Sequence, residues 1–275
     1  MWRGRLSQVF LRNEGTARRI VEAFGPTRAD LVVEIGAGRG ALTRWIVGKA
    51  GYLIAVELDH ELCESLRALD PSEENLFVLC EDFLKIDLHE LISSWMREKG
   101  LSKARIIGNI PYHITTPILK KVLGSATILE DAMLTVQKEV AERMVARPGG
   151  RKYGRLSIFV QVLADPNILF LIPPGSFYPT PKVASAVVHL KMLGKPRVDV
   201  EMKAFLKVVE VAFSERRKKL VNSLSKLGVG KEELVGIMGK AGIEPSTRPE
   251  MLTIDDFSRI SKALMEVCPS LRSEY

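Results

Sequence analysis

A short polar and aromatic segment, Asn109-Ile110-Pro111-Tyr112, carries the residue types in this chain that are best suited to chemistry. It follows an apolar run, residues 104–108, that is typical of a buried parallel strand. Open α/β sheets bind ligands just beyond the carboxyl ends of such strands. The Asn109 amide oxygen can accept a hydrogen bond from an amino group, Pro111 leaves local carbonyls without an internal partner, and Tyr112 offers a flat face to a nucleobase. The segment predicts a site that holds an exocyclic amine for methylation. Taken alone, it equally fits a strand-end turn with a partly buried tyrosine.

A glycine-rich turn follows a second strand-like run. Residues 32–35 lead into Gly36-Ala37-Gly38-Arg39-Gly40, and residues 41–47 then have the pattern of a helix. Glycines let the backbone pass close to a ligand, although this spacing also fits the dinucleotide-binding pattern. The next strand, residues 52–56, ends at Glu57, whose carboxylate can accept hydrogen bonds from both hydroxyls of a ribose. NAD enzymes and S-adenosylmethionine enzymes both bind a ribose with a carboxylate at this position. The simpler interpretation of Glu57 is a solvated charge at the end of a strand.

A second carboxylate, Asp82, follows the third apolar strand in chain order, residues 76–79, in the segment Cys80-Glu81-Asp82-Phe83. Asp82 can accept a hydrogen bond from the amino group of a cofactor adenine. Because the carboxyl ends of parallel strands meet at one edge of a sheet, we expect Gly36, Glu57, Asp82 and Asn109 to converge on one cleft.

The ordered set of motifs resembles that of a known family over nearly the full length of the chain. It is similar to the small-subunit ribosomal RNA adenine dimethyltransferases, the KsgA type and its archaeal and eukaryotic relatives. The matching segments are residues 7–11, 34–38, 57–59, 81–83, 108–112, 137–143, 153–157, 177–183 and 212–218. The chain departs from the family at Val9, where Asn or His is usual. Contacts that use only the main chain would survive this change, and a side-chain contact would not.

The resemblance implies S-adenosylmethionine as the cofactor and transfer of its methyl group to adenine N6 of ribosomal RNA. The residues that it assigns to cofactor binding are Val9, Leu11, Gly36, Gly38, Glu57, Leu58, Asp82, Phe83 and Asn109. The catalytic residues are Asn109, Pro111, Tyr112 and Phe177. In this interpretation the Asn109 side-chain oxygen and the Pro111 carbonyl orient the target amine, and Tyr112 and Phe177 stack on the base. Tyr178 is the nearest competitor of Phe177 for that second stacking surface.

The elements that must position these residues follow from the length and the patterning. The chain has 275 residues with 46% hydrophobic composition, enough for one large domain and one small one. Strand and helix patterns alternate from residue 31 to about residue 123, and strands are expected at residues 132–136, 167–172 and 185–190. We therefore expect a Rossmann-like class I methyltransferase α/β fold with a doubly wound, mostly parallel sheet in residues 1–195. A small all-α, RNA-binding domain is expected in residues 196–275.

The charge of the chain indicates a polyanionic partner. The formal net charge is +7, and a basic surface attracts phosphate backbones. We expect RNA contacts from two clusters, because base chemistry on a large RNA needs phosphate contacts outside the cleft. These residues are Arg143, Arg147, Arg151, Lys152 and Arg155, and Arg216, Arg217, Lys218 and Lys219. A solvated helix face is the alternative for each cluster alone. The expected partner is small-subunit ribosomal RNA in an assembling subunit, with the protein acting as a monomer.

Other residue types set limits on the function. Cys63, Cys80 and Cys268 are odd in number and widely spaced, which favours reduced thiols over a disulfide framework or a zinc site. The four histidines form no ligand-spaced pair, so no metal is expected. Because there is no apolar run of about 18 residues and no signal-peptide pattern at the start, we expect a cytoplasmic protein without a membrane span.

Three other functions remain open at this level. An erythromycin-resistance-type methyltransferase of large-subunit ribosomal RNA shares the fold and the Asn-Ile-Pro-Tyr-His run, although residues 153–157 and 213–218 favour the small-subunit family. A nucleic-acid-binding assembly or transcription factor that has lost catalysis would have no need to keep Gly36, Glu57, Asp82 and Asn109. An NAD-dependent dehydrogenase would leave Asn109 and the basic clusters unexplained.

Overall fold

The computed structural model describes residues 9–72, 74–215, 218–268 and 271. The chain forms two compact units, and each is built from two segments. Unit 1 comprises Met1–Ala141 and Ala164–Lys195, and unit 2 comprises Glu142–Leu163 and Pro196–Tyr275. Residues 142–163 were predicted to belong to the first domain, but they group with unit 2 because Tyr153, Ile158 and Val162 belong to its hydrophobic core.

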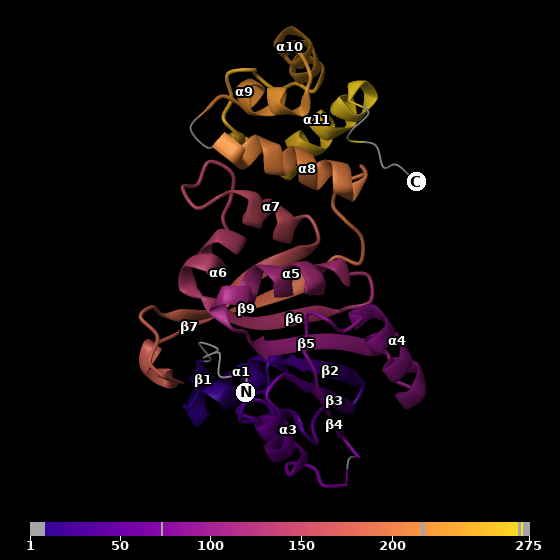
Figure 1. Ribbon diagram of the computed structural model, residues 1–275, viewed down its shortest axis with the longest axis vertical. Coiled ribbons are helices and arrows are strands. Elements are labelled where there is room, and N and C mark those ends of the chain that lie inside the picture. The colour runs from indigo at the N-terminus through magenta and orange to yellow at the C-terminus, as the bar shows by residue number, and fades with distance from the viewer. Residues whose placement is uncertain (1–8, 73, 216–217, 269–270, 272–275) are drawn as a thin grey trace. The chain divides into compact units, whose positions relative to one another are not determined.

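Unit 1 is built on a seven-stranded sheet with the strand order β4-β3-β2-β5-β6-β9-β7 (Figure 1). The strands are β2 (Asp30–Ile35), β3 (Tyr52–Glu57), β4 (Leu76–Cys80), β5 (Lys103–Asn109), β6 (Asp131–Gln137), β7 (Ala164–Ile172) and β9 (Ser185–Met192). The pairs from β4 to β6 are all parallel, and β9 runs antiparallel to both β6 and β7. The mostly parallel sheet predicted from the sequence is confirmed.

Helices cover both faces of this sheet, as a mostly parallel sheet requires. The helices of unit 1 are α1 (Glu14–Phe24), α2 (Thr43–Ile46), α3 (His60–Arg67), α4 (Leu88–Lys99), α5 (Thr115–Gly124) and α6 (Lys138–Met144), the last of which continues into unit 2. Apolar residues of α1, α2 and α3 share one core with residues of β2, β3 and β4, whereas α4 packs against β2 and β5. Every residue of β2 and β3 is consequently buried.

Local signals in the sequence start and stop these helices. The side chain of Asn13 accepts a hydrogen bond from the Thr16 amide at the start of α1, and Asp59 and Asp87 cap α3 and α4 in the same way. Gly25 ends α1 in the left-handed conformation, with φ of 61°. The short α2 covers only part of the helix expected at residues 41–47.

An ion-pair network ties together the amino ends of the strands. Arg105 donates from Nε and Nη2 to the two carboxylate oxygens of Asp131 at 2.7 Å each, and its Nη1 lies 3.2 Å from Asp30 Oδ2. His189 Nε2 lies 2.8 Å from the same Asp131 carboxylate. Burial alone would raise the pKa of Asp131, but the bonds from Arg105 and His189 outweigh it and hold that pKa below its usual range. The charged network therefore lies at the opposite end of the sheet from the predicted cleft, which is at the carboxyl ends of the parallel strands.

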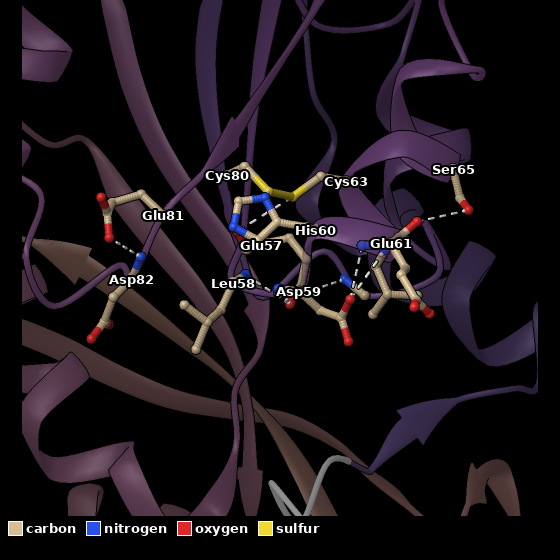
Figure 2. Close-up of a disulfide and its surroundings, with 12 residues drawn as sticks. Glu57, Leu58, Asp59, His60, Glu61, Cys63, Ser65, Cys80, Glu81 and Asp82 are labelled. Carbon is tan, nitrogen blue, oxygen red and sulfur yellow. Dashed lines mark hydrogen bonds between the residues drawn. A yellow bond between two sulfur atoms is a disulfide. The ribbon is translucent and has the colours of Figure 1, made fainter. Parts of the chain in front are cut away.

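The structure corrects the prediction for two of the three cysteines. Cys63 and Cys80 form a disulfide, with their Cα atoms 6.0 Å apart (Figure 2). Their separation of 17 residues in sequence concealed this, because α3 folds back against β4 and brings Cys63 beside the end of that strand. The Cys268 thiol is buried and donates to the Leu227 carbonyl, so it is the cysteine that remains a thiol.

Unit 2 is helical, as the pattern after residue 196 predicted. It contains α7 (Arg155–Gln161), α8 (Met202–Ala212), α9 (Leu220–Leu224), α10 (Lys231–Lys240) and α11 (Ile254–Val267). Phe205, Phe213 and Phe257 are central to its core, and Tyr153 donates from its hydroxyl to the Leu252 carbonyl at 2.9 Å. Within the ranges that the structure describes, no helix has the length and apolar composition needed to cross a membrane.

Candidate active site

A cavity lies at the carboxyl ends of β2, β3, β4 and β5, the place where doubly wound sheets bind ligands. All nine residues that the sequence analysis assigned to cofactor binding line it, together with Pro111 and Tyr112. The lining residues among the predictions are Val9, Leu11, Gly36, Gly38, Glu57, Leu58, Asp82, Phe83, Asn109, Pro111 and Tyr112. The fold thus brings together residues from four strand ends and the N-terminal segment.

The glycine turn forms one wall of this cavity. Gly36 and Gly38 have φ of 67° and 56°, in the region that side chains other than glycine rarely adopt. A Cβ at Gly38 would also lie 3.2 Å from the Phe10 ring. The Gly38 amide donates to Glu57 Oε2 at 2.8 Å, so the turn is held against the neighbouring strand end.

Glu57, beside this turn, forms the next part of the cavity wall. Its side chain is buried, and Oε1 accepts from the amides of Leu58 and Asp59 at 2.8 and 3.0 Å. With the bond from the Gly38 amide, both carboxylate oxygens of Glu57 accept hydrogen bonds from the main chain. A carboxylate offers about four acceptor positions and the three amides occupy three of them, so about one position remains for a ribose hydroxyl.

Asp82 lies at the next strand end. Its Oδ1 accepts from the Leu84 amide at 2.9 Å, and its own amide donates to Glu81 Oε1 at 2.7 Å (Figure 2). This leaves Oδ2 as an acceptor toward the cavity that Asp82 lines. The Cys63–Cys80 disulfide joins the helix that follows Leu58 to the residue that precedes Glu81, so it connects the two segments that carry the predicted ribose and adenine contacts.

The orientation of the Asn109 amide is fixed by the N-terminal segment. Asn109 Nδ2 donates to the Val9 carbonyl at 3.0 Å. Since the amide nitrogen is committed to this bond, Oδ1 is the amide atom left to accept a hydrogen bond from a ligand. The contact uses only the main chain of Val9, so the departure from the family at this position leaves the contact in place.

The Pro111–Ile114 turn corrects one detail of the sequence argument. The Pro111 carbonyl was expected to lack an internal partner, but it accepts from the Ile114 amide at 3.2 Å and lies 3.4 Å from Thr115 Oγ1. These bonds form because residues 112–114 adopt a 3₁₀ turn. The Thr115 hydroxyl has a single proton and lies closer to the Tyr112 carbonyl, at 3.1 Å. When that proton is donated to Tyr112, the Pro111 oxygen keeps one of its two acceptor positions.

Tyr112 is half-buried and shares a hydrogen bond of 2.6 Å with the Ser185 hydroxyl. Burial raises the pKa of the Tyr112 phenol, which therefore stays neutral at physiological pH.

The structure does not bring Phe177 to the cavity. Its side chain is fully buried in the core that also holds Leu11, whereas Tyr178 is 62% exposed. The short strands β1 (Phe10–Leu11) and β8 (Phe177–Tyr178) pair antiparallel and hold the proline-rich loop against the N-terminal segment. Stacking of a base on Phe177 would need this side chain to leave the core, and that role stays a prediction.

One buried acid in the cavity wall has a property that sequence reasoning missed. Glu34 is fully buried, and its Oε2 accepts from the Thr43 hydroxyl at 2.7 Å. Burial raises the pKa of Glu34, the Thr43 hydrogen bonds oppose the rise and the charge of Glu57 adds to it, and the resulting pKa is about 8. The signal available in the sequence was an acid in a continuous apolar strand, which cannot remain charged without a cationic partner.

The basic residues predicted to bind RNA are on unit 2 wherever the structure describes them. The side chains of Arg143, Arg147, Arg151, Lys152, Arg155, Lys218 and Lys219 are exposed. Lys152 pairs with Glu142, Arg155 with Glu210 at 3.1 Å, and Lys218 with Glu215 at 3.4 Å. Arg216 and Arg217 lie outside the described residues.

The cavity fits S-adenosylmethionine by the chemistry of its donors and acceptors. A glycine turn of positive φ permits close approach of a ligand, and Glu57 and Asp82 offer acceptors at neighbouring strand ends. The fold and this arrangement define a class I methyltransferase.

Comparisons with known proteins agree with this class and identify the family within it. The family model described as ribosomal RNA adenine dimethylase matches residues 2–266. The chain therefore belongs to the ribosomal RNA adenine dimethylase family, and it is a ribosomal RNA adenine methyltransferase.

Individual relatives are similar over nearly their whole length. Proteins named ribosomal RNA small subunit methyltransferase A from Caldanaerobacter subterraneus subsp. tengcongensis and Moorella thermoacetica are 40% and 39% identical to this chain. Both matches cover 94% of this chain, with 95% and 90% of the respective relatives.

Two solved structures show the same fold. A dimethyladenosine transferase from Plasmodium falciparum has a TM-score of 0.77 at 24% identity, covering 94% of this chain and 98% of that one. The 23S ribosomal RNA methyltransferase ErmE has a TM-score of 0.69 at 25% identity, covering 93% and 99%.

Proposed function

We propose that this protein uses S-adenosylmethionine to dimethylate N6 of adjacent adenosines near the 3′ end of small-subunit ribosomal RNA, in an assembling subunit in the cytoplasm. The observation that carries the proposal is the fixed Asn109 amide, whose oxygen is left as an acceptor in a cavity that Tyr112 also lines. Family membership supports the rRNA adenine substrate, and the names of the 39–40% identical relatives support the small subunit.

The chain's contribution to the chemistry is positioning. Adenine N6 is a weak nucleophile because its lone pair is delocalised into the ring. Two acceptors, Asn109 Oδ1 and the remaining lone pair of the Pro111 carbonyl, would bind the two amino hydrogens and favour a pyramidal nitrogen. Tyr112 would hold the ring by stacking, which is worth about 1–3 kcal/mol per base. Orientation of this kind lowers the barrier without a general base in the transfer step.

The cofactor would be held by the residues already described. Glu57 would accept a hydrogen bond from a ribose hydroxyl, and Asp82 would accept one from the adenine amino group. When bound, S-adenosylmethionine supplies an activated methyl group. The bonds from Gly38, Leu58 and Asp59 to Glu57 would keep this wall in place before the cofactor arrives.

The direct test is mass spectrometry of ribosomal RNA. Small subunits that lack N6-methylated adenosines are incubated with the full chain and labelled S-adenosylmethionine, and the RNA is then digested and sequenced. We expect N6,N6-dimethyladenosine at neighbouring positions near the 3′ end of small-subunit RNA. Methylation confined to large-subunit RNA would replace the proposal with the erythromycin-resistance-type function, which the similarity to ErmE favours.

A further inference from the structure

The Tyr112 side chain is anchored at both of its ends. At one end, its backbone lies in the three-residue 3₁₀ turn that follows Pro111, and its carbonyl accepts from Thr115 Oγ1 at 3.1 Å. At the other end, the phenol oxygen lies 2.6 Å from Ser185 Oγ. Tyr112 lines the cavity, and its side chain is held between a turn and a strand that is far away in sequence.

Ser185 is a rigid support for this bond. It is fully buried and begins β9, the strand that lies between β6 and β7. The register pairs Ser185 with Gln137 of β6 on one side and with Ile172 of β7 on the other. The preceding carbonyl, that of Ala184, accepts from the Lys138 amide at 3.0 Å. The main chain at Ser185 is thus fixed from two directions.

We propose that Ser185 is a positioning residue for methyl transfer: its hydroxyl holds the Tyr112 ring at the angle at which the target adenine stacks. This inference rests on the proposed function, in which Tyr112 is the stacking surface. Ser185 does not line the cavity, so it acts through Tyr112 rather than on the base. Without the bond, the ring would keep its apolar face but would lose the contact that fixes its tilt.

This role of Ser185 predicts a different activity for Tyr112→Phe than stacking alone does. If only the aromatic face mattered, Tyr112→Phe would retain nearly native activity. If the hydroxyl bond positions the ring, Tyr112→Phe and Ser185→Ala should have the same defect, because each removes the same bond. A typical net hydrogen-bond contribution corresponds to a roughly 3- to 10-fold change, and we expect the rate to fall by that amount in each variant.

The test is a double-mutant cycle with native protein, Tyr112→Phe, Ser185→Ala and the double variant. Single-turnover methylation of unmethylated small subunits gives the maximal rate, and calorimetry gives the affinity for S-adenosylmethionine. We expect both single variants and the double variant to be slowed equally, with the affinities for the cofactor and for the subunit unchanged. A purely structural role would lower affinity and thermal stability together with the rate.

Two control variants distinguish loss of the hydrogen bond from a general effect of replacing a buried serine. Ser185→Thr retains the hydroxyl and should restore most of the rate, whereas Ser261→Ala, another fully buried serine but in unit 2, should leave it native. Independent, multiplying losses in the double variant, or native rates in both single variants, would overturn the role of Ser185. If the native chain methylates only large-subunit RNA, the proposed function fails, and the same cycle on that RNA still decides the role of Ser185.

Discussion

Asn109 shows how a single residue acquires a function from a distant part of the chain. Its amide could take either orientation, and the bond from Nδ2 to the Val9 carbonyl, 100 residues away in sequence, selects one. With the nitrogen turned toward Val9, Oδ1 is left as an acceptor for the ligand. An adenine amino group needs an acceptor, so the orientation agrees with the substrate.

We expect Asn109→Ala to slow single-turnover methylation by about 10²-fold, since misorientation of a reacting group has an effect of that order. The affinity for S-adenosylmethionine should change much less. Asn109→Asp is the matched variant: it keeps an acceptor oxygen but loses the donor to Val9, and it should lie between alanine and the native chain. A normal single-turnover rate in Asn109→Ala would contradict the positioning mechanism.

Glu57→Ala should weaken S-adenosylmethionine binding by about 1–3 kcal/mol in calorimetry, because it removes buried hydrogen bonds. The structure adds a second reason, since the alanine variant also leaves three main-chain amides without their acceptor. Glu57→Gln keeps one acceptor oxygen and should be less impaired. Glu61→Ala, an equal change of charge at an exposed residue outside the cavity lining, is the control. Unchanged affinity in Glu57→Ala, or tight NAD binding by the native chain, would refute the assignment.

At the scale of elements, the carboxyl end of β2 carries a buried acid whose ionisation opposes folding. The pKa of Glu34 is about 8 in the folded chain, against 4.5 when unperturbed. Between these values the folded state holds a proton that the unfolded state releases. The stability contribution is therefore complete below the unfolded pKa and is lost as pH rises through the folded one.

Glu34→Gln should remove this dependence while it keeps an oxygen for the Thr43 hydroxyl. Urea unfolding between about pH 5 and about pH 9 should show native stability falling by several kcal/mol more than that of the variant, with an upper limit of order 5 kcal/mol. The two proteins should be most alike at the acidic end. Parallel stability curves across this range would show that Glu34 is not the responsible group.

The disulfide between α3 and β4 should stabilise unit 1. A loop of this size is expected to contribute about 3 kcal/mol by limiting the unfolded chain. A dithiol reductant, which supplies the two electrons and two protons and is itself oxidised to a cyclic disulfide, should lower the free energy of unfolding of the native protein. Cys63→Ser should be less stable from the outset and should not respond to the reductant. If the reductant lowered the free energy of unfolding of both proteins equally, the disulfide would not be the cause of the destabilisation.

At the scale of the whole molecule, the cavity and the two predicted RNA-binding clusters belong to different units. Unit 1 contains the cavity, whereas unit 2 contains the described members of both predicted RNA-binding clusters. Arg143, Arg147 and Lys219 are exposed and form no ion pair within the described ranges, so their charges are the most available to phosphates.

Neutralising Arg143, Arg147 and Lys219 together should weaken binding to small subunits and flatten its dependence on salt. Each lost phosphate contact removes about 0.7–0.9 from the slope of log affinity against log salt. Binding of S-adenosylmethionine should be native, because none of the three lines the cavity. Replacing Lys49, Arg67 and Arg97, three exposed cations of unit 1, is the control with equal charge. An unchanged slope would mean that the three residues form a solvated surface of unit 2 and do not contact phosphates.

Local patterns in the sequence were enough to predict the strands of the main sheet and the convergence of four strand-end residues on one cavity. Continuous apolar runs predict strands that are buried on both faces, and parallel strands bring their carboxyl ends to one edge. Gly36, Glu57, Asp82 and Asn109 could therefore be placed together without any knowledge of distances. The acid within a buried strand, Glu34, was visible in the same pattern, although its pKa was not.

Contacts between segments that are distant in sequence could not be predicted and emerge from the folded chain. Pairing of Cys63 with Cys80 depends on how α3 folds back on β4, and the assignment of residues 142–163 to unit 2 depends on where Tyr153 finds apolar partners. The Asn109–Val9 and Tyr112–Ser185 bonds likewise join residues whose spacing carries no periodic signal. Local patterns record which face of an element is buried, whereas the partner across that face is chosen by packing of the complete fold.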